Sequence, residues 1–134
     1  MVVGLDTSVL IRLLIGVPAD QATTALAFVK EARLAGQRVV ASDLVVSEAY
    51  FALHFHYDVP KPEAITALSE VLQSGLVDPA DGPAVSAILE EAAQSSAKPG
   101  FVDRLIHAQY ERLPATMATF ERAAARLAGT TVLP

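Results

Sequence analysis

Four acidic side chains stand at positions from which they could share one site. Asp6 ends the apolar run "VVGL", and Glu48 lies inside the helical segment "DLVVSEAYFALHF". Asp103 follows "KPGF", and Glu121 follows "ATMATF". Asp6, Asp103 and Glu121 each follow a predicted strand or open a predicted helix, and such positions gather at one edge of a parallel sheet. The sequence therefore predicts a cluster of carboxylates at that edge.

A carboxylate cluster of this kind favours a hard divalent cation. Two ionised carboxylates in close contact repel by ~4 kcal/mol at an effective dielectric constant of about 20, so four of them need cations to stay ionised together. The chain has no cysteine, which leaves oxygen and imidazole as metal ligands. Oxygen ligands alone select Mg²⁺ or Mn²⁺. Each acid taken singly could instead have a structural role. Asp103, for example, would complement the positive end of its own helix.

The segment around Glu48 has an amphipathic pattern. Glu48 falls on a predicted apolar stripe, and we expect this stripe to face inward. A buried carboxylate is costly unless it is paired, protonated or bound to a cation. Asp43, in contrast, is expected to act with Ser42 as a cap at the helix start. The residues of the predicted stripe are Leu44, Val45, Phe51, Ala52 and Phe55.

Short apolar runs alternate with longer Ala- and Leu-rich segments along the chain. This alternation indicates an α/β fold with a parallel sheet covered on both faces. No linker divides the chain, so residues 1–134 are expected to form one domain. The predicted strands are 2–5, 38–41, 76–77, 115–118 and 130–133. The predicted helices are 9–15, 20–35, 43–57, 61–74, 80–95, 101–112 and 120–127, with "SSAKPG" at 95–100 as a loop.

Composition narrows the class of protein. The chain has 134 residues, 52% of them hydrophobic, which is enough for one domain with a sizeable core. Its apolar stretches are interrupted before the ~20 residues of a membrane helix, and no basic residue precedes the apolar N-terminal run. We therefore expect a cytoplasmic protein without a membrane segment. The net charge of −5 is unusual for a nucleic-acid binder, but with four of the fifteen acids in one site the others nearly balance the ten basic residues.

Four segments resemble, in order and spacing, the acidic motifs of the PIN-domain nucleases. They are "LDTSVLIRLL", "SDLVVSEAYFAL", "GFVDRLIHAQ" and "MATFERAAARL". The chain length is similar to that of the VapC-type toxins of bacterial toxin–antitoxin pairs. The resemblance implies a three-layer α/β/α fold with a parallel, roughly five-stranded sheet. It also implies an endoribonuclease that uses Mg²⁺ or Mn²⁺ to activate water for attack on the RNA phosphodiester.

The resemblance also implies roles for the four acids. Asp6, Glu48 and Asp103 match the three acids that the family keeps best. Asp6 and Asp103 would then bind metal directly, and Glu48 would be a ligand or a base that orients water. Glu121 stands where the family usually has Asp, and its longer side chain would serve a second metal or an outer position.

Substrate and partner contacts follow from the same resemblance. Thr7 and Thr119 match the small hydroxyl residues that flank the first and fourth acids, and nearby basic residues are candidates for RNA binding. The resemblance further implies a homodimer and a small antitoxin partner, whose apolar helix would bind a groove while a basic side chain enters the acidic site. The candidate RNA contacts are Thr7, Thr119, Lys98, Arg104 and Arg122.

Three other functions were weighed against a nuclease. The first is a PIN-like domain that has lost catalysis and acts as an interaction or RNA-binding protein, with Glu121 as the sign of decay. A receiver-type domain expects neighbouring acids at the first strand and a late lysine, but no acid precedes Asp6 and Lys98 is the last lysine. A haloacid-dehalogenase-like phosphatase expects a second Asp where Ser8 stands.

The three histidines are not expected to bind metal. His54 and His56 are two residues apart, and such residues point to different sides of a helix. His107 lies one helical turn after Asp103, and a hydrogen bond to a neighbouring carboxylate is the favoured role for it.

Overall fold

All strand pairs in the described residues are parallel, and helices connect most of the strands. The structure is a computed structural model that describes residues 1–94 and 98–134. Its strands are β1 (Val2–Gly4), β2 (Arg38–Ala41), β3 (Asp78–Pro79), β4 (Met117–Thr119) and β5 (Thr130–Val132). Its helices are α1 (Thr7–Ile15), α2 (Ala19–Leu34), α3 (Asp43–Phe55), α4 (Lys61–Gln73), α5 (Ala84–Gln94) and α6 (Phe101–Glu111), followed by the 3₁₀ helix η1 (Arg122–Arg126).

The strands form two separate sheets. One sheet has the order β1-β2-β3, with Val3 opposite Val39 and Val40 opposite Asp78. The other sheet pairs β4 with β5, with Ala118 opposite Thr131. The α/β fold with parallel strands is therefore confirmed, while the single sheet that the sequence suggested is divided between β1 and β4.

Local sequence explains where most elements begin and end. Ser42 caps α3 by accepting the Val45 N–H group at 3.1 Å. Helix α1 ends at Gly16, whose φ of 76° is accessible to glycine at little cost. Strand β3 lies two residues beyond its predicted position, because β2 pairs with Asp78 rather than with the buried Val77. The Asp78 carboxylate is held there by Arg33 at 3.2 Å.

The core lies where α1, α3, α4 and α5 pack together and against the first sheet. Tyr50 of α3 and Phe101 of α6 join this core through an edge-to-face contact, with ring centroids 5.4 Å apart. Burial of these apolar side chains is the main force that holds the helices together. The largest fully buried apolar side chains of the core include Leu10, Val29, Val39, Val46, Leu53, Leu68, Leu89 and Phe101.

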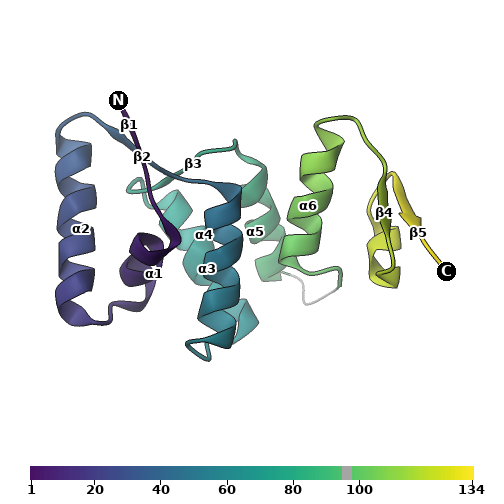
Figure 1. Cartoon of the computed structure of the whole chain (residues 1–134), viewed down its shortest axis with the longest axis horizontal. Helices are drawn as coiled ribbons and strands as arrows, with labels where there is room; N and C mark the ends of the chain where they lie inside the picture. The colour runs from purple at the N-terminus through teal and green to yellow at the C-terminus, as the bar shows by residue number, and fades with distance from the viewer. Residues whose placement is uncertain (95–97) are drawn as a thin grey trace.

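The β4–β5 unit, residues 117–132, lies at one end of the molecule. Figure 1 shows it beyond α6, at the opposite end from α2 and the N-terminus. His107 of α6 contacts the Ala128 carbonyl oxygen through Nε2, and Arg126 donates to the Lys98 carbonyl oxygen at 3.4 Å. Met117 and Ala124 are buried, but Phe120 is 74% exposed. Two polar contacts thus help to join the unit to α6 and to the residues that precede it.

A membrane-spanning helix must be both long and predominantly apolar. No single helix in residues 1–94 and 98–134 is long and apolar enough to cross a membrane. Helices α1 and α2 meet these requirements only when taken together, and a bend of 110° separates them.

Candidate active site

Asp6 lies at the junction of β1 and α1, as the sequence predicted. It is the N-cap residue of α1, with extended backbone angles, and its side chain is exposed. An N-cap Asp usually accepts a backbone N–H group of its own helix. Here the Asp6 carboxylate instead accepts the Ser8 hydroxyl at 3.1 Å, and no cap bond to the described helix is formed. The carboxylate therefore remains available to a ligand.

The Asp6 side chain lines a cavity of about 560 Å³ formed by β1, α1 and α2. Most of the wall is apolar, including Val9 and Phe28. Arg12 and Asp20 add charged groups at the same cavity, and the Arg12 Nε donates to Gln21 at 2.7 Å. The cavity therefore combines an apolar surface with the acidic end of β1.

Asp103 and Glu121 line one cleft, although they come from different elements. Asp103 is in the first turn of α6, as predicted, and Glu121 follows β4. The cleft has a volume of about 520 Å³ and also contains Lys61 and Lys98. Two of the four predicted acids are thus brought to the same place, with two cations beside them. The remaining lining residues are Tyr50, Phe51, Pro62, Ile65, Pro99, Gly100, Phe101 and Val102.

Glu121 itself caps the short helix that follows it. Its carboxylate accepts the Ala123 N–H group at 3.4 Å, and its own N–H group donates to the Thr119 hydroxyl at 3.0 Å. The helix predicted at 120–127 begins at Arg122 instead, so its cap residue is Glu121. The Glu121 carboxylate thus already accepts one structural hydrogen bond, and a bound metal ion would have to share this carboxylate with Ala123.

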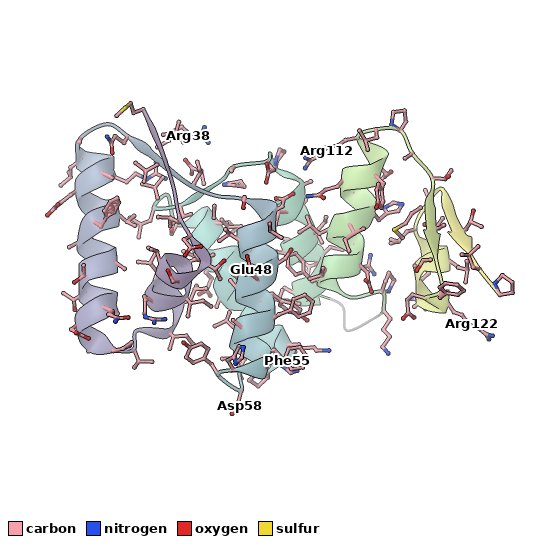
Figure 2. All side chains as sticks on the ribbon, in the orientation of Figure 1. Arg38, Glu48, Phe55, Asp58, Arg112 and Arg122 are labelled. Atoms are coloured by element: carbon pink, nitrogen blue, oxygen red, sulfur yellow. The ribbon has the colours of Figure 1, made fainter. Side chains whose placement is uncertain are left out.

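Glu48 lies on the exposed face of α3, which corrects the predicted orientation of this helix. Figure 2 labels Glu48 near the middle of α3 and Phe55 at its end. Leu44, Phe51 and Phe55 are 69%, 44% and 66% exposed, so these three residues of the predicted stripe do not face the core, whereas Val45 and Ala52 pack partly against it. The buried positions are instead Val46, Ala49, Tyr50 and Leu53, together with Asp43. Because α3 has apolar residues on most sides, its contacts with α1 and α4 decide which face is buried.

The four acids do not form one metal site in this arrangement. Within residues 1–94 and 98–134, no group of three or more His, Asp or Glu side chains could hold a metal ion. Asp103 and Glu121 share a cleft, Asp6 faces another cavity, and Glu48 lies outside both. A Mg²⁺ ion keeps several waters but demands near-ideal octahedral geometry around its carboxylate ligands. The donors as placed therefore do not complete a divalent metal site, because the β4–β5 unit is separate from β1.

Asp43 is a buried acid whose environment the sequence did not reveal. Asp43 is 1% exposed, and burial raises the pKa of its carboxyl group above the usual range. Gln109 donates to its Oδ2 at 3.3 Å, and Arg112 approaches the same atom at 3.7 Å. Its backbone N–H group donates to Asp81 at 2.7 Å. Asp43 therefore fastens the end of α6 to the start of α3 rather than capping α3 with Ser42.

The other predicted contact residues have varied surroundings. The Thr7 hydroxyl is buried and has no hydrogen-bond partner within the described ranges 1–94 and 98–134. Arg104 donates to the Pro99 carbonyl oxygen at 2.9 Å, so it braces the start of α6. Arg122 is exposed at the start of η1, and Figure 2 labels it beside the β4–β5 unit at one end of the molecule.

His107 makes the carboxylate contact that the sequence favoured. Its Nδ1 lies 3.3 Å from a Glu111 oxygen, one turn further along α6. Its Nε2 meets the Ala128 carbonyl oxygen. The side chain is buried, so this histidine serves to connect α6 with the β4–β5 unit.

Searches of curated proteins and of solved structures found no match to the chain. The family model of the PIN domain matches residues 3–130. The matched range contains all four acids and both cavities described above. Because the match covers nearly the whole chain, this protein belongs to the PIN-domain family, whose members are generally nucleases.

Proposed function

We propose that this PIN-domain protein is a metal-dependent endoribonuclease that hydrolyses RNA phosphodiester bonds. The observation that carries the proposal is the cleft in which Asp103 and Glu121 lie beside Lys61 and Lys98. Carboxylates are suited to a divalent cation, and lysines are suited to the phosphates of a nucleic acid. This local balance also explains how a chain with a net charge of −5 can bind RNA.

We propose Mg²⁺ or Mn²⁺ as the cofactor, with Asp6, Glu48, Asp103 and Glu121 as its protein ligands. The chain offers no thiolate, and carboxylate oxygens suit these two ions. Because the acids lie apart in the described arrangement, metal binding requires the β4–β5 unit to approach β1. The two sheets have the free edges that such an approach needs.

The first free edge belongs to β1. The Leu5 N–H group donates to Val40 at 2.9 Å, and the Arg38 N–H group donates to Met1 at 3.1 Å. Met1 and Leu5 therefore face β2. Since alternate residues of a strand face opposite neighbours, the backbone groups of Gly4 face away from β2.

The second free edge belongs to β4. Met117 donates to Gly129 at 3.0 Å, and Leu133 donates to Thr119 at 2.7 Å, so these β4 residues face β5. The backbone groups of Ala118, which lies between them, face the opposite side. Parallel sheets normally have both faces covered, and isolated two-stranded units are marginally stable. Pairing of β4 with β1 would join the two-stranded unit to the three-stranded sheet. It would also bring Glu121 toward Asp6.

We further propose that the protein is the toxin of a VapBC-type toxin–antitoxin pair. The cavity beside Asp6 supports this role, because its apolar wall could hold an antitoxin helix and its Asp6 and Asp20 carboxylates could hold a basic side chain. The exposed Phe55 and Tyr57 support the proposed homodimer, since large apolar side chains at a surface favour association.

The proposal is tested by incubating a partly structured RNA with the purified protein in Mg²⁺, in Mn²⁺ and in EDTA. We expect cleavage with either cation, loss of cleavage in EDTA, and a loss of at least a hundredfold for Asp103→Asn. Asp58→Asn is the matched control, because Asp58 is an exposed acid outside both cavities. Cleavage that persists in EDTA, or in a highly purified Asp103→Asn protein, would contradict the assignment.

The separation of the acids and the Glu at position 121 favour one second candidate function. In that case the domain binds RNA or a protein without cutting it. RNA binding by the wild-type protein, with no cleavage in any divalent cation, would select this alternative.

A further inference from the structure

The cleft that contains Asp103 and Glu121 also has an aromatic wall. Phe51 of α3 lines it and is 44% exposed, although Phe is a side chain that proteins usually bury. The Phe51 ring is held from two sides. Tyr50 meets it edge-to-face with ring centroids 5.4 Å apart, and Phe55 stacks on it at 6.2 Å with an interplanar angle of 25°. Phe51 is therefore a fixed, partly exposed aromatic surface beside the acids.

Two lysines complete the cleft. Lys61 opens α4 and Lys98 precedes α6, and both are exposed. Each can reach a phosphate while it stays in contact with water. Both lysines line the same cleft as Phe51, so cationic and aromatic groups from three separate segments converge there.

Tyr50 adds a polar group to this wall. A tyrosine phenol is protonated at neutral pH, and burial raises the pKa of the Tyr50 phenol further. The hydroxyl group is a hydrogen-bond donor as well as an acceptor in that state. The cleft thus offers a ring, two cations and a neutral hydroxyl.

We propose that this cleft binds one unpaired nucleotide of the RNA, with its base stacked on Phe51 and its phosphates held by Lys61 and Lys98. Aromatic rings combined with cations are the usual means of binding single-stranded nucleic acid. A volume of about 520 Å³ is in the range of small-molecule sites and suits one extruded nucleotide. In a duplex the base is stacked between its neighbours and cannot present its face to Phe51.

This inference rests on the proposed function, and it goes further by naming the side chains that would hold one nucleotide of the RNA. A base on Phe51 and a phosphate at the lysines would bring the adjoining backbone to Asp103, which lines the same cleft. The enzyme would then cut at unpaired segments, and Phe51 and Lys61 would determine specificity without being catalytic residues.

The test measures binding in EDTA, where cleavage does not interfere. The probe is a single-stranded RNA octamer that contains 2-aminopurine, whose fluorescence falls when the base stacks on an aromatic ring. We expect wild-type protein to quench the probe, and Phe51→Ala to lower the affinity by about tenfold, which equals about 1.4 kcal/mol. Phe51→Tyr should restore quenching, because it keeps the ring.

Matched controls separate the cleft from the general surface. Tyr110→Ala removes a ring that is 43% exposed on α6, outside both cavities, and should leave the affinity unchanged. Lys61→Ala should weaken binding several-fold and lower the salt dependence, by about 0.7 in the slope of log K against log salt for one lost phosphate contact. Lys30→Ala, an exposed lysine of α2, should do neither. The octamer annealed to its complement should bind less tightly than the single strand.

The outcomes distinguish failure of this inference from failure of the proposed function. If wild-type protein cleaves RNA but Phe51→Ala binds the octamer as tightly as wild type with equal quenching, the nucleotide site is wrong and the nuclease stands. Equal affinity for duplex and single strand would also overturn the site. If wild-type protein neither binds the octamer nor cleaves RNA, both proposals fall.

Discussion

At the scale of single residues, Glu121 combines a structural bond with a proposed catalytic position. It caps η1 through Ala123 and lines the cleft with Asp103. Asp is a better N-cap residue than Glu, so Glu121→Asp keeps both the charge and the cap. We expect Glu121→Asp to keep the RNA cleavage rate within about tenfold of wild type, a change of ~1.4 kcal/mol in the barrier.

The comparison variant is Glu121→Ala, which removes the carboxylate and the cap together. Its cleavage rate should fall by more than tenfold, but by less than that of Asp6→Asn, because the resemblance gives Asp6 an inner position. The rates are measured on the same RNA in Mg²⁺. Wild-type activity in Glu121→Ala would remove this residue from the site.

Asp43 makes stability depend on pH, since burial raises the pKa of its carboxyl group above the ordinary value of 3.8. At a pH between the ordinary pKa of the unfolded chain and the raised pKa of the folded state, the Asp43 carboxyl group holds a proton in the folded state that it has lost in the unfolded chain. The free energy of unfolding therefore falls as the pH rises through this window, and the loss is complete above the raised pKa. Asp43→Asn cannot lose a proton and removes this contribution.

We expect the melting temperature of Asp43→Asn, relative to wild type, to rise as the pH increases from about 4 to 7. Thermal unfolding followed by circular dichroism measures this difference. Asp58→Asn, on the exposed loop after α3, should show no comparable trend. A difference that is constant with pH, or that shrinks as the pH rises, would show that burial does not control the Asp43 carboxyl group.

At the scale of secondary-structure elements, His107 connects α6 to the β4–β5 unit. Its buried side chain contacts the Ala128 carbonyl oxygen. Loss of a buried hydrogen bond that leaves its partner unsatisfied costs roughly 1–3 kcal/mol. His107→Ala should therefore loosen residues 117–132 more than the core helices. Amide hydrogen exchange measures both regions in one experiment.

The control for this prediction is Glu111→Ala. Glu111 is exposed, and an exposed ion pair contributes little, in the range of about 0–1 kcal/mol. Exchange in β4 and β5 should be nearly unchanged in this variant. If His107→Ala leaves the protection of residues 117–132 intact, other contacts hold the unit to α6.

At the scale of the whole molecule, the prediction concerns the union of the two sheets. The chain has no cysteine, so a disulfide between two introduced cysteines shows that those two positions come close together. Gly4→Cys in β1 has room for its side chain, with no atom of the described residues within 4 Å of the added Cβ, and Ala118→Cys lies on exposed β4. We expect the double variant to form a disulfide under mild oxidation, and faster with Mn²⁺, because carboxylates at the two strand ends would share the ion.

The species formed in this experiment identifies the route by which the sheets join. A disulfide within one chain shows closure of the monomer, whereas a disulfide between chains shows exchange of the β4–β5 unit between two copies. Leu34→Cys with Ala118→Cys is the control, because Leu34 is 88% exposed and belongs to α2 rather than to β1. If Gly4→Cys with Ala118→Cys forms disulfides no faster than this control, with or without Mn²⁺, the sheets do not join.

The sequence by itself determined the elements and the places of the acids along them. Helix periodicity, together with glycine and proline at the boundaries, located six helices and β2, and it put Asp6 at the end of β1 and Asp103 in the first turn of α6. These features depend on residues within one or two turns of each other. The family resemblance, confirmed over residues 3–130, likewise depends on short motifs in a fixed order.

Only the tertiary structure decided which face of α3 is buried, what surrounds Asp43 and which strands share a sheet. Helix α3 has apolar residues on several faces, so its periodicity did not decide which face is buried. The sequence favoured the stripe with Glu48, but Val46, Ala49 and Leu53 are buried instead. Asp43 meets Gln109 only because α6 packs beside α3. Such contacts join residues far apart in the chain, and their free energy depends on the packing of whole elements rather than on local preference.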